Sequence, residues 1–62
     1  SASPKQEKLI ERLIKSHVIT EDERKKTTAW LEKSPTKQDA SGTIDRLQEL
    51  IADRKEAETG AV

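Results

Sequence analysis

The sequence Thr20-Glu21-Asp22-Glu23 carries a helix-start signal that occurs three times along this 62-residue chain. In each copy a hydroxyl residue precedes an acid or amide by three positions, and the other two copies occupy residues 3–6 and 36–39. In such a capping box the hydroxyl accepts a hydrogen bond from a backbone N–H of the first turn, and the later side chain accepts from the cap residue's own N–H. Pro4 stands at the first helical position, where a backbone N–H is not needed. The three signals therefore predict three short helices.

Apolar residues recur at helical spacing behind these signals, which predicts an all-α fold, a small three-helix domain. We expect helices over residues 4–17, 21–33 and 37–57. They form one domain over residues 1–57, and residues 58–62 are expected to be a frayed tail because they show no pattern.

Twelve large apolar side chains are available to fill the core before the tail begins. Most belong to the first and third helices, whereas the second offers only a narrow apolar face. We expect Leu13, Trp30 and Leu47 to be heavily buried, with Trp30 at the centre. Gly42 lies inside the third predicted helix, where it costs about 1 kcal/mol relative to alanine, and it marks either a tolerated defect or a close approach between helices. The twelve are Leu9, Ile10, Leu13, Ile14, Val18, Ile19, Trp30, Leu31, Ile44, Leu47, Leu50 and Ile51.

The composition excludes several kinds of site. The chain has no cysteine, so it has neither disulfides nor thiolate metal ligands. His17 is the single histidine, and no nucleophile or ligand cluster accompanies it, so we interpret it as a packed or capping imidazole. No apolar run is long enough to span a membrane. We therefore expect a cytoplasmic domain without enzymatic activity, cofactor, metal, small-molecule substrate or membrane contact.

Charge is balanced overall but unevenly distributed. Residues 1–37 carry a net charge of +3 and residues 38–62 carry −3. Four cations share one side of the first predicted helix, and we call them the basic ridge: Lys5, Lys8, Arg12 and Lys15. Three further lysines could extend the ridge, depending on how the helices pack: Lys25, Lys26 and Lys37. A row of cations can follow nucleic-acid phosphates, although a solvated surface that keeps a small protein soluble would look the same.

The third predicted helix carries the opposite charge along one side. We call these four residues the acidic stripe: Asp45, Glu49, Asp53 and Glu56. The stripe could be solvated, or it could bind a basic partner or the basic ridge of a second copy of the chain.

The start of the third helix carries a pattern that resembles a known group of proteins. Residues 36–47 read T-K-Q-D-A-S-G-T-I-D-R-L. They resemble the pattern T-K-x-x-A-S-x-x-I-D-x-L of short helical segments in uncharacterised bacterial and phage proteins, in which an earlier P-K-Q element, here residues 4–6, opens a first helix. Such segments are often appended to DNA-handling proteins, so the resemblance implies an accessory role within a larger protein. The third helix is also similar to that of SAP-like helix-loop-helix modules, with Ala40 in place of their leucine.

Two functions follow from these features. The first is a non-catalytic accessory module that binds DNA or RNA phosphates through the basic ridge. The alternative is a protein-interaction or self-association module that uses an apolar groove or the two complementary charged surfaces.

Overall fold

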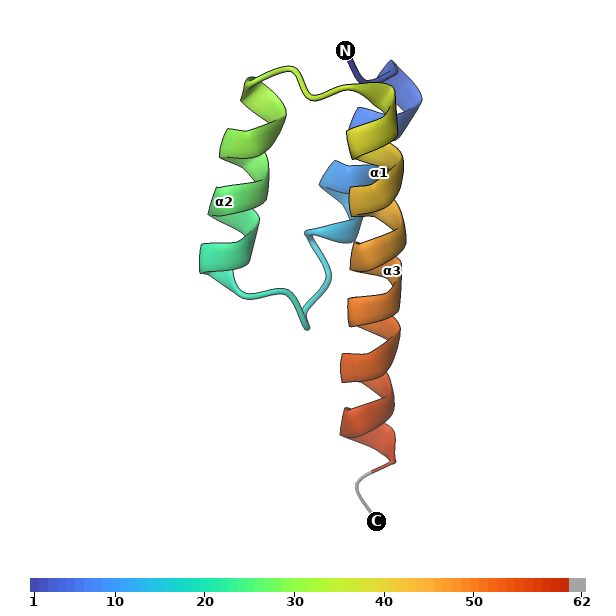
Figure 1. Ribbon diagram of the computed structural model, residues 1–62. Helices are drawn as coiled ribbons and strands as arrows, with labels where there is room; N and C mark the ends of the chain where they lie inside the picture. The colour runs from blue at the N-terminus through green and yellow to red at the C-terminus, as the bar shows by residue number, and fades with distance from the viewer. Residues whose placement is uncertain (61–62) are drawn as a thin grey trace.

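A computed structural model describes residues 1–60, which form three helices and no strand. They are α1 (Pro4–Leu13), α2 (Glu21–Glu32) and α3 (Lys37–Thr59), as Figure 1 shows. The all-α, three-helix prediction is confirmed. Helix α1 packs closely against α3, whereas α2 runs beside them without a comparable contact. The C-terminal end of α3 extends beyond the other two helices (Figure 1).

The helix starts follow the predicted capping signals. At α1 the Ser3 hydroxyl accepts from the Gln6 N–H at 3.2 Å, and the Gln6 side chain accepts from the Ser3 N–H at 3.0 Å. Thr20 and Glu23 repeat this reciprocal pair at α2, at 3.1 and 2.9 Å. Because both partners of each box lie within four residues, the sequence alone determines where these two helices begin.

The third start is only half of a capping box. The Thr36 hydroxyl accepts from the Asp39 N–H at 3.0 Å. No reciprocal bond from the Thr36 N–H to the Asp39 carboxylate is present among the described residues. The aspartate side chain is one methylene shorter than the glutamate or glutamine of the other two boxes, so it does not reach back across the turn.

The helix ends differ from the predicted bounds. Helix α1 stops at Leu13 instead of residue 17, because the chain tightens into a turn in which the Lys15 N–H bonds to the Arg12 carbonyl at 3.2 Å. Helix α2 ends one residue early, before Ser34, which adopts a left-handed φ of 55° ahead of the buried Pro35. Helix α3 runs to Thr59, two residues into the predicted tail, and residues 61–62 lie outside the described residues.

The core lies between α1 and α3. Ile10 and Ala40 are completely buried at its centre. The small Ala40 side chain lets the two helices approach each other closely. The buried apolar residues are Ala2, Ile10, Ile14, Ile19, Ala40, Ile44, Leu47 and Ile51.

The predicted central position of Trp30 is wrong. Leu47 is buried as expected, with 8% of its surface exposed, but Leu13 and Trp30 are only half-buried against the edge of the core. Helix α2 contains no buried residue. Its apolar face is too narrow to bring it into close contact along its whole length, so Trp30 fills the space between α2 and the α1–α3 pair.

An ion pair attaches the N-terminal end of α2 to α3. The Arg54 guanidinium donates to both carboxylate oxygens of Glu23, at 2.7 and 2.9 Å, and also to the Val18 carbonyl at 2.8 Å. These bonds from Arg54, together with the Thr20 backbone N–H, lower the pKa of Glu23 to about 2. The same pairing raises the pKa of Arg54. Polar contacts therefore hold the N-terminal end of α2 in place.

Two further contacts hold the loops. Arg24 donates to the Ile14 carbonyl at 2.8 Å and to the Ile19 carbonyl at 3.4 Å, which satisfies acceptors in the turn after α1. At the other end of the domain the Gln6 side-chain amide donates to the Lys37 carbonyl at 3.1 Å. This contact joins the first turns of α1 and α3.

Candidate functional site

The basic ridge lies on the outer side of α1. Lys5, Lys8 and Arg12 are exposed and lie about 140–160° around the helix axis from the buried Ile10, as expected for 100° per residue. Lys15 is exposed in the turn that follows. Among residues 1–60 none of the four forms an ion pair or a side-chain hydrogen bond. The ridge is therefore a row of cations that is not used to hold the fold together.

The three additional lysines are not all placed beside the ridge. Lys37 is the first residue of α3 and bonds through its carbonyl to Gln6, so its backbone lies at the start of α1. Lys25 lies on α2, 3.9 Å from Glu21, in an exposed ion pair. Lys26 also lies on α2, where it lines a groove described below.

The acidic stripe lies on the outer side of α3. Its four residues are exposed and lie about 100–180° around the axis from the buried Ile44. Within the part of the chain that the structure describes, none of them forms an ion pair. Helices α1 and α3 pack through the sides that carry Ile10 and Ile44. The basic ridge and the acidic stripe lie on the other side of each helix, so they face away from each other and do not meet within one molecule.

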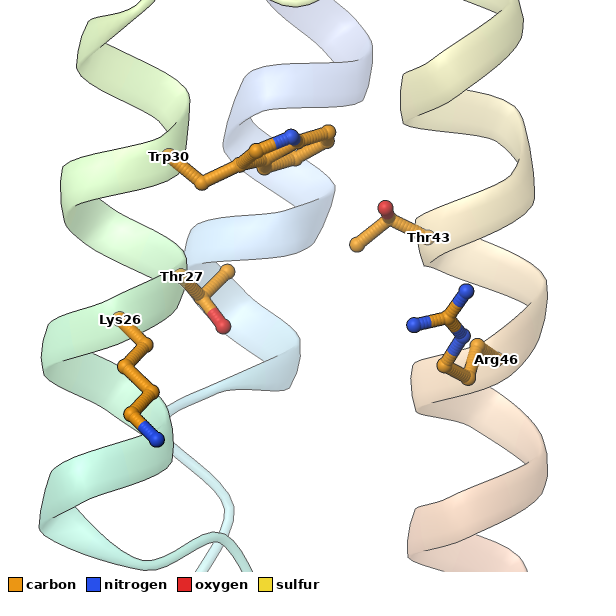
Figure 2. A pocket seen from close by; sticks show the side chains of 5 residues that line it. All are labelled: Lys26, Thr27, Trp30, Thr43 and Arg46. Carbon is orange, nitrogen blue, oxygen red and sulfur yellow. The ribbon is translucent and has the colours of Figure 1, made fainter.

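A groove between α2 and α3 is the feature that the sequence analysis did not locate. Figure 2 shows Thr27 and Trp30 on α2 pointing toward Thr43 and Arg46 on α3, around a hollow of about 210 Å³. A neighbouring hollow of about 240 Å³ shares residues with the first and adds apolar walls from Ile19, Leu47 and Leu50. We call the two hollows and their continuation along α3 the α2–α3 groove.

The groove walls combine apolar residues with Thr27, Thr43 and the Arg54-bound Glu23, and two unpaired cations lie at the middle. Lys26 on α2 and Arg46 on α3 line both hollows. Neither forms an ion pair or a side-chain hydrogen bond among the described residues, in contrast to Arg24 and Arg54, which hold the fold. The narrow apolar face of the second predicted helix was the one sequence signal for a groove here, since a helix with so few apolar residues leaves part of its neighbour uncovered.

Gly42 lies at the edge of this groove. It lines a third hollow together with Trp30, Thr43 and Arg46. A Cβ atom added at Gly42 would meet no other atom within 4 Å, and its φ angle is not positive. Within residues 1–60 no close approach of another helix accounts for this glycine, so the interpretation of Gly42 as a contact between helices of one molecule is wrong for the described residues.

His17 is not the packed or capping residue that the sequence suggested. Its Nε2 atom lies 2.8 Å from a carboxylate oxygen of Glu58, and the two side chains are 68% and 50% exposed. Because α1 ends before His17, the imidazole lies in a loop and reaches the exposed end of α3. In residues 1–60 there is no group of three acidic, histidine or cysteine side chains placed to hold a metal ion. No helix in this range has the length and apolar character needed to cross a bilayer.

Comparisons of the chain with models of protein families, with curated proteins and with solved structures found no match.

Proposed function

We propose that this domain is a non-catalytic accessory module of a larger bacterial or phage protein and that it binds nucleic acid through the phosphates. The observation that supports the proposal is the basic ridge, whose four cations are exposed and unpaired within the described residues. Cations that a fold does not use for its own stability are available to a polyanion.

The dimensions of the ridge fit a short run of phosphates. Seven residue steps separate Lys5 from Arg12 on α1, or about 10 Å at 1.5 Å per residue, and Lys15 lies in the turn beyond the helix. Phosphates of one strand follow one another at about 3.4 Å along the axis of a duplex, so about three lie along the helical part of the ridge. The ridge contains no asparagine or glutamine and only one arginine to read base edges. Binding is therefore weak, sensitive to salt and independent of sequence.

The test is replacement of all four ridge cations by glutamine, with binding to a short DNA duplex measured by fluorescence anisotropy over a range of salt concentrations. Wild-type affinity should fall with salt with a log–log slope of about −3 to −4. The quadruple variant should lose binding and keep its helical circular dichroism spectrum, because glutamine is a good helix former.

A matched pair of double variants distinguishes an effect of the ridge cations from an effect of the total charge of the domain. Lys8→Gln with Arg12→Gln removes two ridge cations, and Lys33→Gln with Lys55→Gln removes two exposed cations elsewhere. The first pair should reduce the magnitude of the salt slope by about two, and the second should leave it unchanged. Equal losses in both variants would contradict a site on the ridge.

A second candidate, self-association, rests on the opposite charges of two exposed surfaces whose residues form no ion pair within the described residues. The acidic stripe extends over eleven residue steps of α3, about 16 Å, and carries four charges, as many as the basic ridge. If the stripe of a second copy binds the ridge, the quadruple variant will remain monomeric in sedimentation where the wild type associates. Reversing the charges of both surfaces together should then restore association.

A further inference from the structure

The α2–α3 groove is long enough for several turns of a helix. Its hollows share Arg46 and follow one another along α3 from Asp39 to Asp53; residues of both helices line three of them, and α3 alone lines the one at Asp53. Fourteen residue steps correspond to about 20 Å, or close to four helical turns. None of the basic-ridge residues lines it, so the groove is separate from the surface proposed for nucleic acid, whereas it shares Glu49 and Asp53 with the acidic stripe.

The charges along the groove change sign from its ends to its middle. Lys26 and Arg46 lie at the centre, Asp39 lies at one end, and Glu49 and Asp53 lie at the other. Between them the half-buried Trp30 and Leu50 and the buried Leu47 supply apolar wall, together with Thr27 and Thr43. Glu23 also lines the central hollow, where its carboxylate is bound by Arg54. A complementary occupant therefore has an apolar face, a carboxylate at its middle and basic residues toward both ends.

We propose that the α2–α3 groove binds an amphipathic helix of a partner protein, with its apolar side chains against Trp30, Leu47 and Leu50 and a central carboxylate between Lys26 and Arg46. Helix-in-groove recognition uses anchors at positions i, i+3 or i+4, and i+7 of the bound helix. The groove length accommodates this repeat, and its charge pattern sets the partner's charges.

Other occupants fit these residues less well. A phosphate backbone would meet carboxylates at both ends of the groove, where a polyanion is repelled. The projecting end of α3 from a second copy has no large apolar side chain over residues 52–60, so it cannot fill apolar walls. A helix from another protein satisfies both requirements.

Gly42 gives an independent reason to expect a close approach here. It interrupts α3 with a residue that disfavours helices, lies at the groove, and leaves open space that no part of the described chain fills. Glycine on a helix surface lets another backbone come close, because no side chain separates the two. A bound helix that crosses α3 at Gly42 would account for a glycine that the isolated domain does not need.

The probe is a synthetic helical peptide of about 18 residues, with leucines at the i, i+3 or i+4 and i+7 spacing, a central glutamate and terminal lysines. A second peptide has the same leucines but a central lysine and terminal glutamates. Binding is followed through the fluorescence of Trp30, the only tryptophan. The complementary peptide should shift the emission to shorter wavelength and bind at least about threefold more tightly than its inverted counterpart.

Three variants test the residues of the groove. Lys26→Gln with Arg46→Gln should reduce the preference between the peptides without abolishing it, because the carboxylates at the ends of the groove still favour terminal lysines. Gly42→Leu should weaken binding of the complementary peptide by about tenfold or more because it fills the groove. The matched control is Ser41→Leu, since Ser41 is exposed on the same helix and lines none of the hollows.

The outcomes distinguish failure of the groove proposal from failure of the proposal that the basic ridge binds nucleic acid. Equal binding of the two peptides, binding of neither, or equal effects of Gly42→Leu and Ser41→Leu would overturn it. The quadruple ridge variant should bind the complementary peptide as the wild type does. Loss of DNA binding by the quadruple variant would then be an effect of the basic ridge and not of the groove.

Discussion

Ile10, not Trp30, is expected to contribute most to stability. Ile10 is completely buried, whereas Trp30 is half-buried at the edge of the core. Replacing a buried isoleucine by alanine costs about 2–5 kcal/mol. A chain of this length has a total stability of roughly 3–9 kcal/mol, at about 0.05–0.15 kcal/mol per residue. Ile10→Ala should therefore unfold much of the population, although Trp30→Ala removes a far larger side chain.

The more conservative Ile10→Val keeps the comparison measurable. Removing one methylene from this site costs about 0.5–1.5 kcal/mol, which lowers the melting temperature of a domain this small by about 2–12 °C. The assay is urea unfolding followed by far-ultraviolet circular dichroism for the wild type, Ile10→Val, Ile10→Ala and Trp30→Ala. If Trp30→Ala lowers the free energy of unfolding more than Ile10→Ala, the core does not lie between α1 and α3 and the reasoning is refuted.

Two further predictions concern the loss of stability at acid pH and the backbone strain in the turn after α2. The pKa of Glu23 is about 2 in the folded chain against an ordinary 4.5, so its pairing with Arg54 stabilises the fold above pH 4.5 and is lost as the pH falls from 4.5 toward 2. Glu23→Gln should flatten this part of a stability–pH profile, and an unchanged profile would contradict the ion pair. Ser34 has a left-handed φ of 55°; Ser34→Gly removes a strain of about 1–2 kcal/mol against an entropy cost of about 0.4–1 kcal/mol. Thermal melting should show Ser34→Gly at least as stable as the wild type and Ser34→Ala no more stable, whereas a less stable glycine variant would show that the turn is not strained.

The starts of the helices were predictable because their signals are local. Ser3 and Thr20 begin α1 and α2 through bonds to residues three positions later, so the contact is contained in a four-residue sequence. The end of α1 was not predictable in this way. The turn after Leu13 is stabilised by Arg24 and Arg54, which approach from other helices and bond to the carbonyls of residues 14, 18 and 19.

The prediction that Trp30 lies at the centre of the core was wrong for a related reason. The pattern of apolar residues shows which side of a helix is buried but not how closely that helix packs against its neighbours. The small Ala40 brings α1 and α3 together, and α2 is then left at their side. The α2–α3 groove is a consequence of that spacing, so no single helix pattern could show it. The exposure of the basic ridge was predictable because it depends on α1 alone.

Helix α2 is held to the rest of the domain mainly at its two ends. Its first turn is held by Glu23 and Arg54, and its last turn is joined to α3 by the short connection through Pro35, while no residue between them is buried. Because α2 contributes no buried residue whereas α3 contributes four, we expect the backbone amides of α2 to exchange with solvent by local opening at a lower free energy than those of α3. The wall of the groove that carries Trp30 is therefore expected to be more adaptable than the wall formed by α3.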